Sequence, residues 1–161
     1  MIIDGGGDSE RIIQWIDSGI GYPDDEIGSF EGERKVVALI NTHAHFDHSG
    51  HIPYLKEHYS LEWWLHEDDF FLQSLAKESG RRWGFSLPEP AVAENTWKHG
   101  EVHTFADMEF EIIHTPGHTL GGCCLRLIVD DGPDHLFAGD TLFQGSIGRT
   151  DLPNSGGDLE L

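Results

Sequence analysis

The residues best suited to chemistry lie in the stretch 42–48, which reads Thr-His-Ala-His-Phe-Asp-His. Imidazole and carboxylate side chains are the ligands that zinc, iron and manganese take in proteins. His43 and His45 are two residues apart, so an extended backbone projects both to one side, where they can chelate one ion. Asp47 and His48 continue the turn and can face a second ion. The stretch follows an apolar run, which predicts a metal site at the edge of a sheet.

Two later stretches are arranged in the same way: in each, polar residues directly follow a predicted strand. Residues 114–119 read His-Thr-Pro-Gly-His-Thr, and residues 139–141 read Gly-Asp-Thr. In a layered α/β fold, ligands gathered from separate strand ends meet at one edge of the sheet. A lone histidine is more often structural, but a cluster repeated at three strand ends favours a metal centre.

The first half of the chain alternates predicted strands and helices. Asp8 or Ser9 can cap a helix that carries Ile12, Ile13 and Ile16 on one face and stops near Gly19. The rest of this half consists of a strand at 36–40, a helix from Ser49 with Pro53 in its first turn, a strand at 61–65, and a helix at 67–77 with Phe70, Phe71, Ser74 and Leu75 facing inward. This alternation predicts an α/β layered fold.

The second half changes period after Gly100. Apolar residues at every second position predict a half-buried strand at 108–113, and two more strands are expected at 125–129 and 136–138. Between the halves, residues 79–100 form a predicted loop rich in aromatic residues and proline. Two interpretations stay open for it: a loop packed onto the core, or aromatic walls for a substrate cleft.

The length, charge and composition of the chain exclude several classes of function. At 161 residues the chain fits one domain, 1–161, and the net charge of −19 argues against a nucleic-acid or anionic-membrane partner. No apolar run approaches the ~18 residues needed to span a bilayer, and no signal peptide is visible, so we expect a cytoplasmic protein. The adjacent pair Cys123 and Cys124 would point to opposite faces of a strand, which predicts buried free thiols.

The three polar stretches resemble the motifs of a known family. Residues 43–48 resemble the HxHxDH signature of the metallo-β-lactamase-fold hydrolases, and residues 115–119 and 139–141 resemble their second and third motifs. The order and spacing also agree over essentially the whole chain. Residues 139–143, followed by 145–153, look more narrowly like the small glyoxalase II-like branch. The first signature is highly specific for the superfamily, and the last segment is moderately specific for the branch.

The resemblance implies an αββα four-layer sandwich and a metal-dependent hydrolase. It implies a thioester substrate such as hydroxyacylglutathione, attacked by a metal-bound hydroxide that Asp47 orients while shuttling protons. Zn²⁺ is the implied metal, with Fe or Mn as alternatives. The implied ligands are His43, His45 and His118 for the first ion and Asp47 and His48 for the second, with Asp140 bridging both.

Other histidines fall outside the motif positions. His114 leaves the same strand as His118, but the family's ligand follows the Pro-Gly pair, so we interpret His114 as structural or as a support for the ligands. The histidines that we interpret as surface or structural residues are His51, His58, His66, His99, His103 and His135.

The chain also departs from the family pattern. No histidine follows the third motif, and no strand hairpin precedes residues 2–4, so both ends of the fold, above all the C-terminal part, are expected to be missing. The second metal site would then be weakly held. Arg149 and Asp151 stand where the larger glyoxalase II enzymes carry Lys and Tyr. Arg149 could grip a substrate carboxylate or pair with Asp151 to pin the loop, and both options stay open.

Two rival functions share these motifs. Persulfide dioxygenases use one iron, held by the residues matching His43, His118 and Asp140, and a catalytically impaired metal-binding fragment would turn over nothing. β-Lactamase activity is disfavoured because those enzymes are typically exported. The expected partner is therefore a small-molecule thioester, and the oligomeric state is left open.

Overall fold

The computed structural model describes residues 1–18 and 34–152. A parallel sheet of three short strands lies at its centre, in the order β1 (Ile2–Ile3), β2 (Leu39–Ile40) and β3 (Trp63–Trp64). Leu39 pairs with Ile2 and Trp63, and Ile40 pairs with Ile3 and Trp64. Because successive side chains alternate between faces, Leu39 and Trp63 enter one apolar core, whereas Ile40 and Trp64 contact another.

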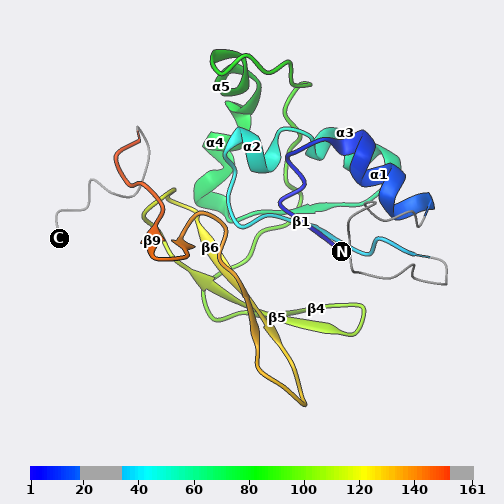
Figure 1. Ribbon diagram of the computed structural model, residues 1–161, viewed down its shortest axis with the longest axis vertical. Helices are drawn as coiled ribbons and strands as arrows, with labels where there is room; N and C mark the ends of the chain where they lie inside the picture. Colours follow the sequence, from blue (N-terminus) through cyan, green and yellow to red (C-terminus); the bar gives the residue numbers. More distant parts are fainter. Residues whose placement is uncertain (19–33, 153–161) are drawn as a thin grey trace.

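The first core lies between the parallel sheet and the helices (Figure 1). Helix α1 (Ser9–Ser18) packs Ile12, Ile13 and Ile16 against it, as the sequence predicted. The backbone N–H of Arg11 donates to Asp8 Oδ1 at 3.1 Å, so Asp8 is the residue that caps this helix. The helices that follow β2 are α2 (Phe46–Ser49) and α3 (Ile52–Tyr59), the latter with Pro53 in its first turn.

The second core lies between the parallel sheet and an antiparallel sheet. The strands of this sheet are β4 (Val102–Phe105), β5 (Met108–His114), β6 (Cys123–Ile128) and β7 (His135–Phe137), in that order. Phe110 and Ile112 are fully buried against Ile40, which confirms the predicted period of two. A small hairpin follows, made of β8 (Leu142–Phe143) and β9 (Ser146–Ile147). Helices, parallel sheet and antiparallel sheet are three layers of the expected four; within the described residues every helix precedes β4.

The helix predicted at 67–77 is wrong in its bounds and in half of its inward-facing residues: Phe70 packs against the first core and Leu75 is partly buried, but Phe71 and Ser74 face outward. The structure has a 3₁₀ turn, η1 (Glu67–Asp69), and then two short helices, α4 (Phe70–Ser74) and α5 (Ala76–Arg82). Phe71 is 57% exposed and Ser74 is exposed, whereas Asp69 and Gln73 are buried. These two polar side chains turn inward because they accept backbone hydrogen bonds there, Gln73 from the N–H of Ala93 and Asp69 from the N–H groups of Ala44 and Gly121.

Smaller differences concern strand lengths and the loop at 79–100. Only the last two residues of the predicted strand 36–40 pair with neighbours, although Val36 and Ala38 are also buried. Helix α5 reaches to Arg82, inside the predicted loop. Trp97 is buried in the second core, so the loop there is packed onto the core, whereas Trp83 is exposed.

The two cysteines are buried and free, as predicted. Burial raises the pKa of Cys123 to about 12, so this thiol stays protonated at neutral pH and is not a nucleophile. In residues 1–18 and 34–152, no helix is long and apolar enough to cross a membrane.

Candidate metal centre

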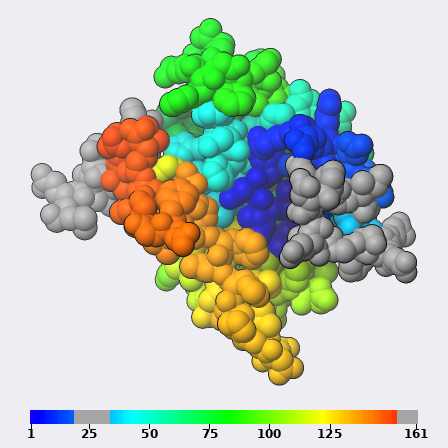
Figure 2. Space-filling view, viewed as in Figure 1, coloured from blue at the N-terminus to red at the C-terminus, as the bar shows by residue number. Residues whose placement is uncertain are grey.

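Four segments converge at one edge of the parallel sheet. The stretch 42–48 leaves β2, the loop 115–122 joins β5 to β6, Asp4 follows β1, and Asp140 follows β7. Figure 2 shows the face where the first of these segments (cyan) is flanked by α5 (green) and by residues 140–152 (orange to red). The structure thus brings together all six residues that the sequence proposed as ligands.

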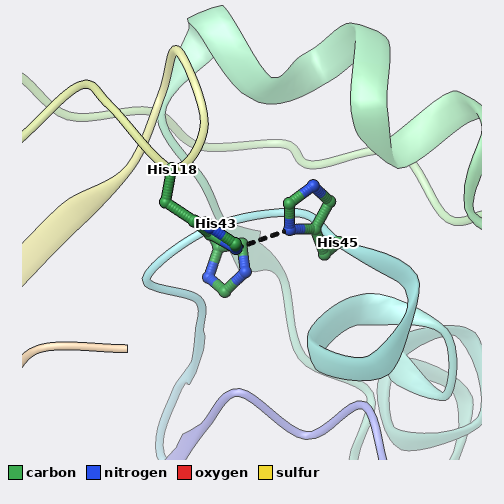
Figure 3. A group of neighbouring side chains, drawn as sticks. All are labelled: His43, His45 and His118. Atoms are coloured by element: carbon green, nitrogen blue, oxygen red, sulfur yellow. Dashed lines mark hydrogen bonds between the residues drawn. The ribbon is translucent and has the colours of Figure 1, made fainter. Parts of the chain in front are cut away.

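Three imidazoles form the centre of the site (Figure 3). His43, His45 and His118 each offer a nitrogen, and these nitrogens all lie within 4.8 Å of one another. His45 Nδ1 is 2.9 Å from His118 Nε2, close to the separation of about 3.3 Å between tetrahedral ligands of zinc. The ring centroids of His43 and His118, and of His43 and His45, are 5.0 Å apart with steep interplanar angles. The ring edges therefore converge on one point.

A hydrogen-bond chain fixes the tautomer of His43. The hydroxyl of Thr42 donates to Asp4 Oδ2 at 2.8 Å, so its oxygen is left to accept a proton from His43 Nδ1 at 3.1 Å. His43 Nε2 is then unprotonated, and it is buried with no hydrogen-bond partner among the described residues. An orphaned lone pair aimed at two other imidazoles is the arrangement that a bound cation satisfies. The residues fit a divalent metal.

Replacing Thr42 with valine tests this chain, because valine keeps the shape and removes the hydroxyl. We expect the affinity for Zn²⁺ to fall about 10- to 100-fold, the usual cost of losing a partner that orients a ligand. Competition with a chelator measures it. Thr42→Ser keeps the hydroxyl and should bind as the parent does; equal affinities of the valine variant and the parent would contradict the role of Thr42.

The charges of the imidazoles suit metal binding. Burial, reinforced by neighbouring histidines, lowers the pKa of His43 well below its usual value and that of His45 to about 4. Both rings are therefore neutral at pH 7, the form that binds metal. His118 Nδ1 donates to the carbonyl of Arg149 at 2.9 Å, which leaves its Nε2 lone pair facing His45.

A second group of ligand atoms lies beside the first. His48 Nε2 is 3.3 Å from Asp140 Oδ1 and 3.9 Å from Asp47 Oδ2, and Asp140 Oδ2 is 3.4 Å from His118 Nε2. Asp140 thus contacts both groups. Burial lowers the pKa of His48, but Asp4, Asp47 and Asp140 raise it more, so the net shift is upward. Gly139 has a φ of +49°, and a Cβ there would lie 2.2 Å from Thr42 Oγ1, so glycine lets Asp140 approach.

Asp69 forms hydrogen bonds with two loops of the site, 42–48 and 115–122. It is 0% exposed, and its carboxylate accepts from the N–H of Ala44 at 2.9 Å, the N–H of Gly121 at 2.7 Å and the hydroxyl of Thr119 at 3.0 Å. Ala44 stands between two histidines of the site, and Thr119 follows His118. Burial raises the pKa of Asp69 in spite of these three hydrogen bonds.

His114 does not join the centre. Its Nε2 donates to the carbonyl of Leu120 at 2.8 Å, and its ring stacks on His66 with centroids 4.0 Å apart and an angle of 13°. Asp68 lies near this pair, so the three form a further group of possible ligands. However, two parallel rings present faces to each other instead of converging edges, which supports a structural role for His114.

The metal-site residues lie in the wall of a cleft of about 470 Å³. Its lining combines ligands with apolar and cationic side chains: His45, Phe46, Asp47, Leu72, Leu75, Ser79, Arg82, Trp83, His118, Asp140, Arg149 and Leu152. Arg149 is held by Asp151 through two hydrogen bonds, Nε to Oδ1 at 2.7 Å and Nη2 to Oδ2 at 3.0 Å. This bidentate pair is the geometry expected if Arg149 pins its own loop.

Sequence reasoning missed several residues at the site. Asp4 and Thr42 support the histidines, and Arg82 and Trp83 line the cleft. Asp4 could have been found from the sequence, because it directly follows a short apolar strand. If that strand pairs in parallel with the one before 42–48, the two strand ends lie side by side. Asp69 could not have been found in this way, because its partners are 25, 50 and 52 residues away.

Comparison with known proteins agrees with this geometry. The model of the metallo-beta-lactamase superfamily matches residues 1–160. The hydroxyacylglutathione hydrolase GloC of Haemophilus influenzae is 37% identical over 99% of this chain and 68% of its own length. Among solved structures, TTHA1623 in a di-iron-bound form has a TM-score of 0.74 and 31% identity, covering 95% of this chain and 67% of its own.

A second solved structure, the BLEG-1 B3 metallo-beta-lactamase, has a TM-score of 0.77 and 29% identity, covering 98% of this chain and 68% of its own. The chain thus spans about two thirds of the length of these relatives. The α/β fold class is confirmed. With a family match over residues 1–160 and three histidines converging at one sheet edge, the chain belongs to the metallo-beta-lactamase superfamily.

Proposed function

We propose that this chain is a metal-dependent hydrolase that cleaves a thioester such as hydroxyacylglutathione. The observation that carries the proposal is the convergence of His43, His45 and His118 next to His48 and Asp140 in the wall of a cleft. The similarity to a hydroxyacylglutathione hydrolase over 99% of the chain supports the substrate class.

The chain supplies two sets of metal ligands in this proposal. His43, His45 and His118 would hold one divalent ion, and Asp47, His48 and Asp140 would hold a second, with Asp140 shared. Such ions, when bound, lower the pKa of water towards about 7 and polarise a carbonyl oxygen. Zn²⁺ suits this ligand set, and Fe or Mn are accommodated by the same imidazoles and carboxylates.

Asp47 is the residue to which we assign proton transfer. Its side chain is 59% exposed and lines the cleft, and it lies 3.9 Å from His48. A carboxylate in that position can orient an attacking water and carry its proton to the leaving group. No serine or cysteine nucleophile is required, and the protonated, buried thiol of Cys123 is unsuited to that role.

The test is thiol release from S-lactoylglutathione by the zinc-loaded chain at neutral pH, with the chelated chain as control. We expect turnover in the first and none in the second. Oxygen consumption with glutathione persulfide by an iron-loaded chain, without thioester cleavage, would contradict the hydrolase. Failure to cleave any thioester, ester or lactam in excess Zn²⁺ would instead identify a fragment that only binds metal.

The two ions are expected to differ in affinity. The first site has three imidazoles, whereas the second has one imidazole and two carboxylates, of which Asp140 is shared. Dialysis against increasing chelator should therefore remove one ion well before the other, with metal content per chain followed by elemental analysis. Two ions lost together, with equal affinity, would contradict unequal sites.

A further inference from the structure

The end of α5 lines the same cleft as the candidate metal ligands. Arg82 is the last residue of this helix and Trp83 is its C-terminal cap, and both line the cleft that contains Asp47 and Asp140. Neither residue belongs to the three sequence motifs. Figure 2 shows α5 (green) next to the segment that carries the first histidines (cyan).

This end of α5 is held firmly against the metal-site helix α2. A Cβ built at Gly80 would lie 2.4 Å from Leu87 Cδ1, so glycine lets the side chain of this loop residue pack on α5, and it would lie in ordinary contact, 3.5 Å, with Cδ2 of Phe46 in α2. Phe85 N–H donates to the carbonyl of Gly80 at 2.9 Å, and its ring packs on Phe46 at 5.7 Å between centroids. Arg82 and Trp83 therefore start from a backbone fixed relative to the ligands.

The charge of Arg82 is only loosely compensated. Its Nε lies 3.6 Å from Glu78 Oε1, and Glu78 already accepts two hydrogen bonds from Arg81, at 3.0 and 3.1 Å. Arg149, the other arginine of the cleft, is held bidentately by Asp151. The Arg82 side chain is 74% exposed. In a chain with a net charge of −19, it is thus the cleft guanidinium best placed to take an external anion.

Trp83 adds apolar surface beside this charge. It is 72% exposed, and together with Leu72 and Leu75 it lines the same cleft. A ligand that covered this indole would remove a large apolar area from water, which favours binding. The lining of the cleft therefore combines candidate metal ligands with apolar and cationic side chains.

We propose that Arg82 and Trp83 select the leaving group of the substrate, with Arg82 gripping a carboxylate on the thiol half and Trp83 covering its aliphatic part. The inference rests on the proposed thioesterase function for its kinetic test, but binding tests it independently. It assigns to Arg82 the role that the sequence left open for Arg149, and it defines the substrate as a thioester whose thiol carries a carboxylate.

The kinetic test compares two thioesters that share one acyl group. S-Lactoylglutathione carries carboxylates, whereas S-lactoyl-N-acetylcysteamine carries none. We expect Arg82→Met to raise KM for the first about 10- to 100-fold, the usual loss for a hydrogen bond to a charged group, with kcat nearly unchanged and the second substrate unaffected. Arg82→Lys should recover part of the loss. The matched control is Lys77→Met, since Lys77 lies on the same helix, is paired with Glu89 and does not line the cleft.

The binding test uses S-hexylglutathione, a thioether that cannot be hydrolysed, titrated by calorimetry into the metal-loaded chain. Arg82→Met and Trp83→Ala should each weaken binding, and Trp83→Phe should retain most of it. If the parent cleaves neither thioester, the proposed function fails, but weaker binding by Arg82→Met would still support the site. Equal effects of Arg82→Met on both substrates, or S-hexylglutathione binding that is absent in the parent or unchanged in the variants, would overturn the inference.

Discussion

Replacing His45 with alanine is expected to reduce kcat/KM for thioester cleavage by at least about 10³-fold, a loss of roughly 4 kcal/mol of transition-state stabilisation. His45 Nδ1 lies 2.9 Å from His118 Nε2 and belongs to the group of three converging imidazoles. Without it, His43, His118 and Asp140 would be left to hold the proposed first ion, which would lower the affinity for the metal and the charge stabilisation that it would supply. Thiol release from S-lactoylglutathione, measured together with metal content, checks the prediction.

The variant should stay folded, because His45 lies at the edge of the cleft and is only partly buried. Circular dichroism and urea unfolding would show this. His58→Ala is a suitable control, since His58 is a half-exposed histidine on α3 that pairs with Asp17 at 2.7 Å. It should retain full activity. Turnover by His45→Ala equal to that of the parent would rule out the proposed site.

The sequence indicates the candidate ligands because their signals are local. His43, His45, Asp47 and His48 share one short stretch, and a short motif needs no knowledge of the tertiary structure. The alternation of Phe110 and Ile112 with acidic residues likewise predicted a half-buried strand that the structure has. Periodicity is a property of neighbouring residues, so it survives in any fold that buries one face.

The remaining features depend on distant partners. The segment 67–77 is partly helical as predicted, but its buried face differs because Asp69 and Gln73 accept hydrogen bonds from backbone groups elsewhere in the chain, and no local pattern shows those donors. The same holds for Arg82, which is unremarkable in sequence and acquires its place in the cleft only through the packing of Gly80 on Leu87 and Phe46. Tertiary contacts override local preference where polar side chains satisfy buried donors.

Replacing Asp69 with alanine is expected to have the largest effect on stability, about 3–5 kcal/mol. The substitution leaves the N–H groups of Ala44 and Gly121 and the hydroxyl of Thr119 without their acceptor in a fully buried position. Because these donors belong to both metal-site loops, affinity for Zn²⁺ should fall as well, by about 10- to 100-fold. Urea unfolding of the metal-free chain and chelator competition separate the two effects.

Asp69→Asn provides the sharper comparison, because the amide keeps the shape and one acceptor oxygen. We expect a smaller loss, about 1–2 kcal/mol, with partial recovery of metal affinity. Asp68→Asn is the matched control, since Asp68 is an exposed neighbour on the same turn, and it should change stability little. Equal stability of Asp69→Ala and the parent would show that the three donors find other partners.

The stability that Asp69 contributes is expected to decrease as the pH rises. Burial raises the pKa of Asp69 above its ordinary value of 3.8, so between 3.8 and the raised value the folded state binds more protons than the unfolded state. Stability contributed by this group is therefore fully present below pH 3.8 and declines as the pH rises through the native pKa. The asparagine variant lacks that titration. The free energy of unfolding of the parent should exceed that of Asp69→Asn by an amount that shrinks as the pH rises above 3.8 and then levels off. A difference that grows with pH would mean that the three hydrogen bonds outweigh the burial of the carboxylate.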